Sequence, residues 1–206
     1  MNCQCNSSLV LDALLVVGTF LTIIVALFGE EFRKRWFGPK LFIRLIDNNG
    51  DLNKTNGKTD TIYYHLVAGN LKKTPAQNAV VLLSEIFEVI DDKKHIIWRG
   101  EVPMRWMYYE IYNRVSITLG SDSRCDFLAV NNDGIRLMTL FKPNNLEKCW
   151  NRPCNLLFTL FVKSDQAISN LITIQTIWDG EWFNSPEAMS KHLSIVAIKQ
   201  CNQHSD

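Results

Sequence analysis

Cysteines, histidines and paired carboxylates are the residues of this chain that could bind a metal or transfer a proton. Cys149 and Cys154 stand close to the spacing of zinc ligands, but a zinc site needs two more ligands supplied by the fold. Cys125 and His192 are the available candidates. Two reduced thiols in a Trp-containing loop are the simpler interpretation, so the sequence predicts no metal and no cofactor.

The carboxylate groupings have a simpler explanation than acid–base catalysis. Asp179-Gly180-Glu181 follows an apolar segment, where an Asp-Gly pair is first a signal for a tight turn. Asp126, which follows Cys125 and lies near Asp122, fits a residue that hydrogen-bonds a turn. The sequence motifs of hydrolases, nucleotide-binding loops and zinc proteases are absent. We therefore expect no catalytic residues and a protein that is not an enzyme.

A segment rich in aromatic and arginine side chains is the best sequence candidate for a binding surface. Its composition is typical of interaction hot spots and of stacking platforms. In a β-sandwich, however, alternate residues of such a segment fill the core. We expect half of it to be core and half surface, with Arg105 and Tyr109 as the exposed contacts for a partner. The segment contains Trp98, Arg99, Arg105, Trp106, Tyr108, Tyr109, Tyr112 and Arg114.

Composition and charge set the limits for these hypotheses. The chain has 206 residues, 47% hydrophobic and 21% charged, which suits one globular domain plus an anchor. The net charge is +1. A domain that binds phosphate backbones usually carries a marked basic excess, so we expect no nucleic-acid partner.

The segment Leu9–Phe28 is apolar except for Asp12, and we predict a transmembrane helix over residues 9–29. Twenty residues at about 1.5 Å each cover roughly 30 Å, the thickness of the hydrocarbon core of a bilayer. A buried core helix normally has a polar face, which this segment lacks after Asp12. A signal peptide needs basic residues before the apolar run, whereas the first basic residue is Arg33.

The basic residues indicate the orientation of the helix. They follow the apolar segment, which keeps that side in the cytoplasm and leaves residues 1–8 outside. We expect residues 30–38 to be a basic juxtamembrane stop, whose membrane-interface residues are Arg33, Lys34, Arg35 and Trp36. A plain stop-transfer signal is a simpler interpretation of this stretch than specific lipid recognition.

Small residues recur every four positions within the predicted span. Gly18, Thr22 and Ala26 fall on one face of the helix. Such faces let transmembrane helices approach closely, so these residues are predicted to pack against a second helix. Chance is the alternative, because small residues are common in these helices.

Residues 39–199 carry the period-two pattern of short strands. We predict strands at 41–47, 61–69, 78–90, 95–99, 125–130, 135–141, 156–163, 171–178 and 192–199. Asn131–Gly134 is the clearest hairpin turn, whereas residues 48–60 are predicted to be a long loop. Ser185-Pro186-Glu187 predicts one short helix, and residues 200–206 a polar tail. The fold class is therefore mainly β, an antiparallel sandwich after one transmembrane helix.

The soluble part contains several short sequence motifs that support a resemblance to known proteins. In chain order they are Tyr64-His65-Leu66-Val67 with Asn70, Pro75-Ala76-x-Asn78, Trp98-Arg99-Gly100-x-Val102-Pro103-Met104-Arg105-Trp106, Ile117-Thr118-Leu119-Gly120 with Cys125-Asp126, and Trp178-Asp179-Gly180-x-Trp182. In this order the chain resembles a group of uncharacterised bacterial proteins that have one N-terminal transmembrane helix and an Ig-like β-sandwich. The resemblance implies an architecture and no activity, so no catalytic residue is carried over from it.

The sequence thus favours a membrane-tethered, non-catalytic binding or sensing module at the cytoplasmic face of a bacterial inner membrane. Its expected partners are the lipid bilayer and either another protein or a second copy of the chain. One alternative is an accessory subunit of a larger membrane assembly. Another is an effector whose helices cluster and perturb the membrane.

Overall fold

The computed structural model describes residues 6–46, 48–54, 59–107, 115–143, 145–146 and 149–198. The chain divides into two compact units, Met1–Gly38 and Pro39–Asp206. Each unit is described by itself below.

The first unit is built on one helix, α1 (Asn6–Phe37). The stretch Leu11–Gly29 is long and apolar enough to cross a membrane, and the side chains from Leu11 to Phe28 are all exposed. Helix α1 continues through the basic stretch that follows the apolar segment. The hydroxyls of Thr19 and Thr22 donate to the carbonyls of Leu15 and Gly18, so these polar groups keep a partner on an apolar helix.

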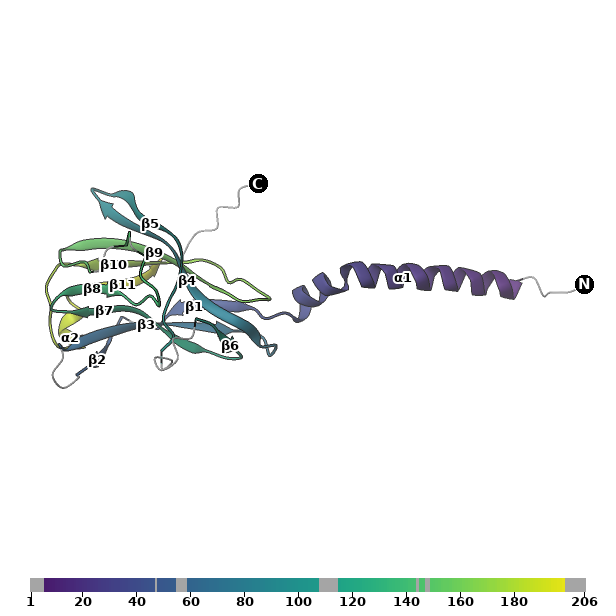
Figure 1. The fold of residues 1–206 in the computed structure, drawn as a ribbon, viewed down its shortest axis with the longest axis horizontal. Coiled ribbons are helices and arrows are strands. Elements are labelled where there is room, and N and C mark those ends of the chain that lie inside the picture. The colour runs from purple at the N-terminus through teal and green to yellow at the C-terminus, as the bar shows by residue number, and fades with distance from the viewer. Residues whose placement is uncertain are drawn as a thin grey trace, which may run out of the picture. The chain divides into compact units, whose positions relative to one another are not determined.

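The second unit is a β-sandwich of two antiparallel sheets (Figure 1). This confirms the predicted fold class. In the first sheet, β3 (Thr61–Asn70) pairs with β1 (Leu41–Leu45) and β2 (Asp51–Asn53) on one side and with β7 (Ser123–Asn131) on the other, and β7 pairs with β8 (Gly134–Leu137).

The second sheet is larger and is organised around one long strand, β4 (Ala76–Ile90). The strand order is β11-β10-β9-β4-β5, and β6 pairs with the first residues of β4. The bounds of the other strands are β5 Lys93–Pro103, β6 Ile117–Leu119, β9 Cys154–Lys163, β10 Ile172–Trp178 and β11 Leu193–Ile198.

The core lies between the two sheets and is filled by alternate residues of each strand. On β3, the alternate residues Ile62, Tyr64, Leu66 and Ala68 are fully buried. Large aromatic side chains join the sheets near the centre. The Phe127 and Phe158 rings, for example, meet edge to face with centroids 5.3 Å apart.

The β7–β8 and β4–β5 turns are both made by residue types that favour turns. The β7–β8 turn ends at Gly134, whose φ of 121° favours glycine. A Cβ there would also collide with the carbonyl oxygen of Trp150. The β4–β5 turn uses Asp91 and Asp92 at φ 49° and 60°, a conformation that Asp tolerates better than most residues.

The short helix α2 (Pro186–Met189) begins as its sequence predicts. The Ser185 hydroxyl accepts a hydrogen bond from the Ala188 N–H at 3.2 Å, and proline occupies the first turn.

Two local predictions were wrong. The predicted loop 48–60 contains β2, because Asp51–Asn53 extends the edge beside β3. Within the same stretch, Asn48 Oδ1 accepts a hydrogen bond of 2.7 Å from the Ile195 N–H of β11. The strand predicted at 135–141 ends at Leu137, because the Met138 carbonyl accepts from the Arg105 N–H and the Leu140 N–H donates to the Pro103 carbonyl.

Candidate functional site

The predicted contact residue Arg105 lies between β5 and β6, where its backbone bonds to residues of the first sheet and to the segment that follows β8. The Arg105 N–H donates to the Met138 carbonyl at 3.0 Å, and its own carbonyl accepts from the Asp126 N–H at 2.9 Å. The side chain of Arg105 is half-buried. Tyr109 lies outside the described residues, as do Tyr108, Tyr112 and Arg114.

The described remainder of this aromatic segment, Trp98, Arg99 and Trp106, divides between core and surface. The side chains of Trp98 and Trp106 are buried in the core. Arg99 lies on the surface, where its Nε donates to Glu85 at 2.8 Å across the β4–β5 pair. This arginine is therefore engaged in an ion pair on the outer face of the sheet.

A carboxylate–imidazole cluster lies where β10 ends and β11 begins. Nδ1 of His192 is 2.6 Å from Asp179 Oδ2 and 3.7 Å from a carboxylate oxygen of Glu181. The Phe183 ring stacks on the imidazole at a centroid distance of 4.2 Å. The imidazole is thus held by two acids at its edge and by an aromatic ring on its face.

Strand pairing and a tight turn position this cluster. Trp178 pairs with Leu193, so the next residue on each strand, Asp179 and His192, come to lie opposite each other. Asp179 Oδ1 accepts from the Glu181 N–H at 2.9 Å, which closes the turn. Gly180 in this turn has a φ of 95° and packs closely on Pro153.

The charge state of Asp179 follows from these contacts. Burial acts against the shift, but the hydrogen bond from the Glu181 N–H and the nearby His192 imidazole lower the pKa of Asp179 below its ordinary value. The carboxylate therefore stays ionised to a lower pH than a free aspartate. Such a group orients the imidazole and presents negative charge at the surface.

A second imidazole lies on β3 between two carboxylates. His65 Nδ1 is 3.0 Å from Asp126 of β7, and Nε2 is 3.4 Å from Asp51 of β2. His65 and Asp126 are both buried. The angles of these contacts do not meet hydrogen-bond geometry, so the imidazole lies close to both carboxylates without a hydrogen bond to either.

A β-bulge produces this arrangement. The register between β3 and β7 shifts at Tyr64/His65, where Tyr64 pairs with Leu128 and His65 with Asp126. Phe127 is the extra residue, so Phe127 and Leu128 both enter the core while Asp126 turns to the outer face.

Two buried groups near this bulge, the Cys125 thiol and the Tyr64 hydroxyl, are held neutral. Burial, with a smaller contribution from the charge of Asp126, raises the pKa of the Cys125 thiol well above its ordinary value. Burial likewise raises the pKa of the Tyr64 hydroxyl. A thiol in this environment is a poor nucleophile, because only the thiolate is reactive.

The cysteines and histidines considered as zinc ligands occupy different places. Cys149 Sγ donates to the Asp133 carbonyl at the β7–β8 turn, Cys154 is buried at the start of β9, and Cys125 is buried on β7. Within the described ranges, no group of three or more His, Cys, Asp or Glu residues could hold a metal ion.

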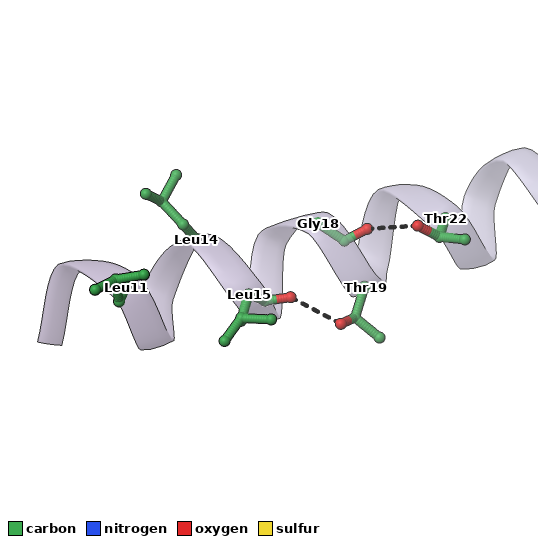
Figure 2. A pocket seen from close by; sticks show the side chains of 6 residues that line it. All are labelled: Leu11, Leu14, Leu15, Gly18, Thr19 and Thr22. Carbon is green, nitrogen blue, oxygen red and sulfur yellow. Dashed lines mark hydrogen bonds between the residues drawn. The ribbon is translucent and has the colours of Figure 1, made fainter. Parts of the chain in front are cut away.

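On α1, the predicted packing residues Gly18, Thr22 and Ala26 are exposed. Leu11, Leu14, Leu15, Gly18, Thr19 and Thr22 line a shallow groove on the helix surface (Figure 2). A side chain added at Gly18 would meet no atom of the chain within 4 Å. Arg33, Lys34 and Arg35 lie in the last turns of α1, where the structure describes the backbone, and Trp36 beyond them is exposed.

The chain matches no protein-family model, and no curated protein matches it. The functional proposal therefore rests on the contacts and surfaces of the chain itself.

The two imidazole–carboxylate clusters were not predicted from the sequence. A signal for the first was present, because an antiparallel pairing of the predicted strands 171–178 and 192–199 places Asp179 opposite His192. No local signal identifies the second, because His65 and Asp126 meet through strands far apart in the sequence and through a bulge.

Proposed function

We propose that this chain is a single-pass membrane protein whose β-sandwich is a non-catalytic binding or sensing module. The observation that carries the proposal is the combination of a helix with a fully exposed apolar stretch and a separately packed domain. Exposed apolar surface of this extent is unfavourable in water and favourable in lipid.

The proposed orientation places the N-terminus outside and the sandwich in the cytoplasm of a bacterial cell. It is supported by Arg33, Lys34 and Arg35, which follow the apolar stretch, because cytoplasmic flanks are enriched in basic residues. A fluorescent protein fused after Asp206 is expected to fluoresce, since it folds only in the cytoplasm. A C-terminal alkaline phosphatase fusion with high activity would reverse the orientation.

We propose that the sandwich belongs to the wider class of Ig-like folds. The order β1-β3-β7 matches strands A, B and E of that fold, and β5-β4-β9-β10 matches C′, C, F and G. Two departures accompany this match. Strand β8 takes the place of strand D but follows β7 in the chain, and β11 adds a strand at the edge.

The non-catalytic part of the proposal is supported by the contacts of the two imidazoles. Within the described residues, His65 and His192 contact carboxylates and receive no hydrogen bond from a hydroxyl or thiol. A nucleophile activated by an adjacent base needs such a bond. The best-placed thiol, Cys125, is buried in its neutral form.

Arg105 and Tyr109 remain the proposed contacts for a partner protein. The test is native mass spectrometry of the full-length chain, extracted in mild detergent from its own membrane. A bound protein that is lost from the double variant Arg105→Ala with Tyr109→Ala, but retained by Arg99→Ala, supports this surface. A complex that survives the double variant unchanged excludes it.

The alternative, an accessory subunit or a clustering effector, is favoured by the groove around Gly18 on α1. Gly18→Leu fills this groove and is expected to shift the chain to a smaller assembly, whereas Ile24→Leu on the opposite face is the control. Assembly size that is the same for both variants would exclude packing through this face. If the chain also releases dye from vesicles, it acts as an effector, and if it releases none, it acts as a subunit.

A further inference from the structure

We propose that one end of the sandwich docks on the anionic lipid leaflet beside α1, an inference that rests on the proposed membrane span. This tether end consists of Lys40, the β3–β4 turn Leu71–Pro75 and the β9–β10 loop Ser164–Leu171. Strand register brings these segments to the same end of the two sheets, where β1 begins and β3 and β9 finish (Figure 1).

Asn70 fixes the β3–β4 turn to the beginning of β1. Its Oδ1 accepts from the N–H groups of Lys40 and Lys72, both at 3.0 Å, and its Nδ2 donates to the Thr74 carbonyl at 2.7 Å. The Leu71 N–H donates to the Lys40 carbonyl at 2.9 Å. The turn is therefore attached to the residue at which the chain enters the sandwich.

Backbone and side-chain bonds connect the β9–β10 loop to the same end. The Asp165 N–H donates to the Gln77 carbonyl at 3.1 Å, and Gln166 accepts from the Gln77 N–H at 2.9 Å. Gln77 is the second residue of β4, directly after the β3–β4 turn. The turn and the loop therefore form one continuous surface.

This surface exposes large aliphatic side chains on segments that are normally polar. Leu71 and Ile168 are each 63% exposed, and Leu171 is 51% exposed. Single exposed aliphatic residues need no explanation, but three on adjoining loops indicate an interaction surface. Aliphatic side chains beside lysines suit the interface of a bilayer.

The charges of the tether end complement an anionic leaflet. Its three lysines, Lys40, Lys72 and Lys73, outnumber its one carboxylate, Asp165, whose charge is not offset by the neutral amide of Asn78 that donates to it at 2.7 Å. The neighbouring Asp122 pairs with Arg44 at 3.4 Å. The opposite end of the sandwich carries the acids Asp91, Asp92, Asp133, Asp179, Glu181 and Glu187 together with the bases Lys93, Lys94, Arg152 and Lys191, so acids are in excess there. An anionic surface therefore attracts the tether end and repels the other.

The length of the connection keeps the tether end near the lipid. The apolar stretch ends at Gly29, and eight helical residues at about 1.5 Å each, roughly 12 Å, lead to Phe37. Gly38 and Pro39 alone separate Phe37 from Lys40. Lys40 therefore lies at most about 22 Å along the chain from the end of the apolar stretch, so the tether end cannot move far from the anionic leaflet.

Amide hydrogen exchange of the full-length chain in nanodiscs tests the proposal. Nanodiscs of phosphatidylglycerol with phosphatidylcholine are compared with nanodiscs of phosphatidylcholine alone. Exchange in Leu71–Ala76 and in Ser164–Ile172 is expected to slow by about fivefold in the anionic lipid, the factor that one lysine near such a leaflet supplies. Equal exchange in the two lipids would overturn the docking.

Two lysine pairs provide matched variants. Lys72→Glu with Lys73→Glu is expected to abolish the difference between the lipids. Lys93→Glu with Lys94→Glu, in the β4–β5 hairpin at the opposite end, is expected to leave it unchanged. If both double variants reduce the protection equally, the effect comes from net charge and the docking surface is wrong.

An extraction step separates this inference from the proposed function. Alkaline carbonate removes peripheral proteins and leaves spanning helices in the membrane. A chain that is extracted overturns both the membrane span and the docking. A chain that is retained but shows no lipid-dependent protection of the two loops overturns the docking alone.

Discussion

Among single residues, Asp179 is expected to give the clearest dependence of folding stability on pH. Its pKa is lowered in the folded state, so its contribution to stability is present above the ordinary pKa of aspartate and is lost as the pH falls through the lowered value. His192 and the Glu181 N–H stabilise the ionised form.

The variant Asp179→Asn tests this contribution, because the amide oxygen can still accept the bond from the Glu181 N–H. The wild type is expected to be more stable than the variant above the ordinary pKa of aspartate, about 4, and the difference should shrink as the pH falls through the lowered pKa of Asp179. Urea unfolding of the full-length chain in detergent, followed by tryptophan fluorescence, measures the difference. A difference that stays constant across this range would contradict the assignment.

Asn70 is the second residue with a large expected effect. Its buried side chain bonds to Lys40, Lys72 and Thr74, so Asn70→Ala leaves several backbone groups without a partner. We expect a loss of about 2–3 kcal/mol in the free energy of unfolding.

Asn155→Ala is the matched control for Asn70→Ala, because that side chain accepts a single bond from Gln175. Its expected cost is about 1 kcal/mol. Equal losses for the two alanine variants, measured by urea unfolding, would show that the β3–β4 turn does not depend on Asn70.

At the scale of elements, the β7–β8 hairpin depends on one glycine. Gly134→Ala adds a Cβ that meets the Trp150 carbonyl at a φ of 121°. The expected loss is about 2–4 kcal/mol, from strain in the turn and displacement of the residue that pairs with Ile135. Gly120→Ala, where a Cβ meets nothing within 4 Å, should change stability by less than about 1 kcal/mol.

Local patterns predicted most of the sandwich because period-two burial and turn residues are local properties. The strand at 61–69 and the hairpin turn at Asn131–Gly134 are examples. Strand ends were less predictable. Gly100 and Pro103 resemble strand breakers, yet both lie in β5, because that strand pairs along β4 nearly to its end.

The candidate sites could not be predicted to the same extent, because pairing between distant segments creates them. His65 meets Asp126 only once β3 and β7 pair and a bulge turns Asp126 outward. Strand β2 was missed for a related reason: its three residues, Asp51–Asn53, are strand because β3 offers them an open edge. Propensity alone favours a loop there.

At the scale of the whole molecule, the two compact units imply that the sandwich is stable without α1. A protease site inserted between Gly38 and Pro39 is expected to release the sandwich from membranes at high salt. The released domain should unfold in urea with the same midpoint as the full-length chain. A lower midpoint, or aggregation on release, would show that α1 contributes to the stability of the sandwich.

In the proposed membrane-bound state, copies of this chain move in two dimensions. They therefore meet one another more often than the same number of molecules free in the same volume of solution. Strand β11 is an edge strand with Val196 and Ile198 exposed, and such edges pair readily with neighbouring molecules. Asn48 occupies the Ile195 N–H on that edge. This amide side chain therefore removes one of the donors to which a strand of a neighbouring molecule would bond.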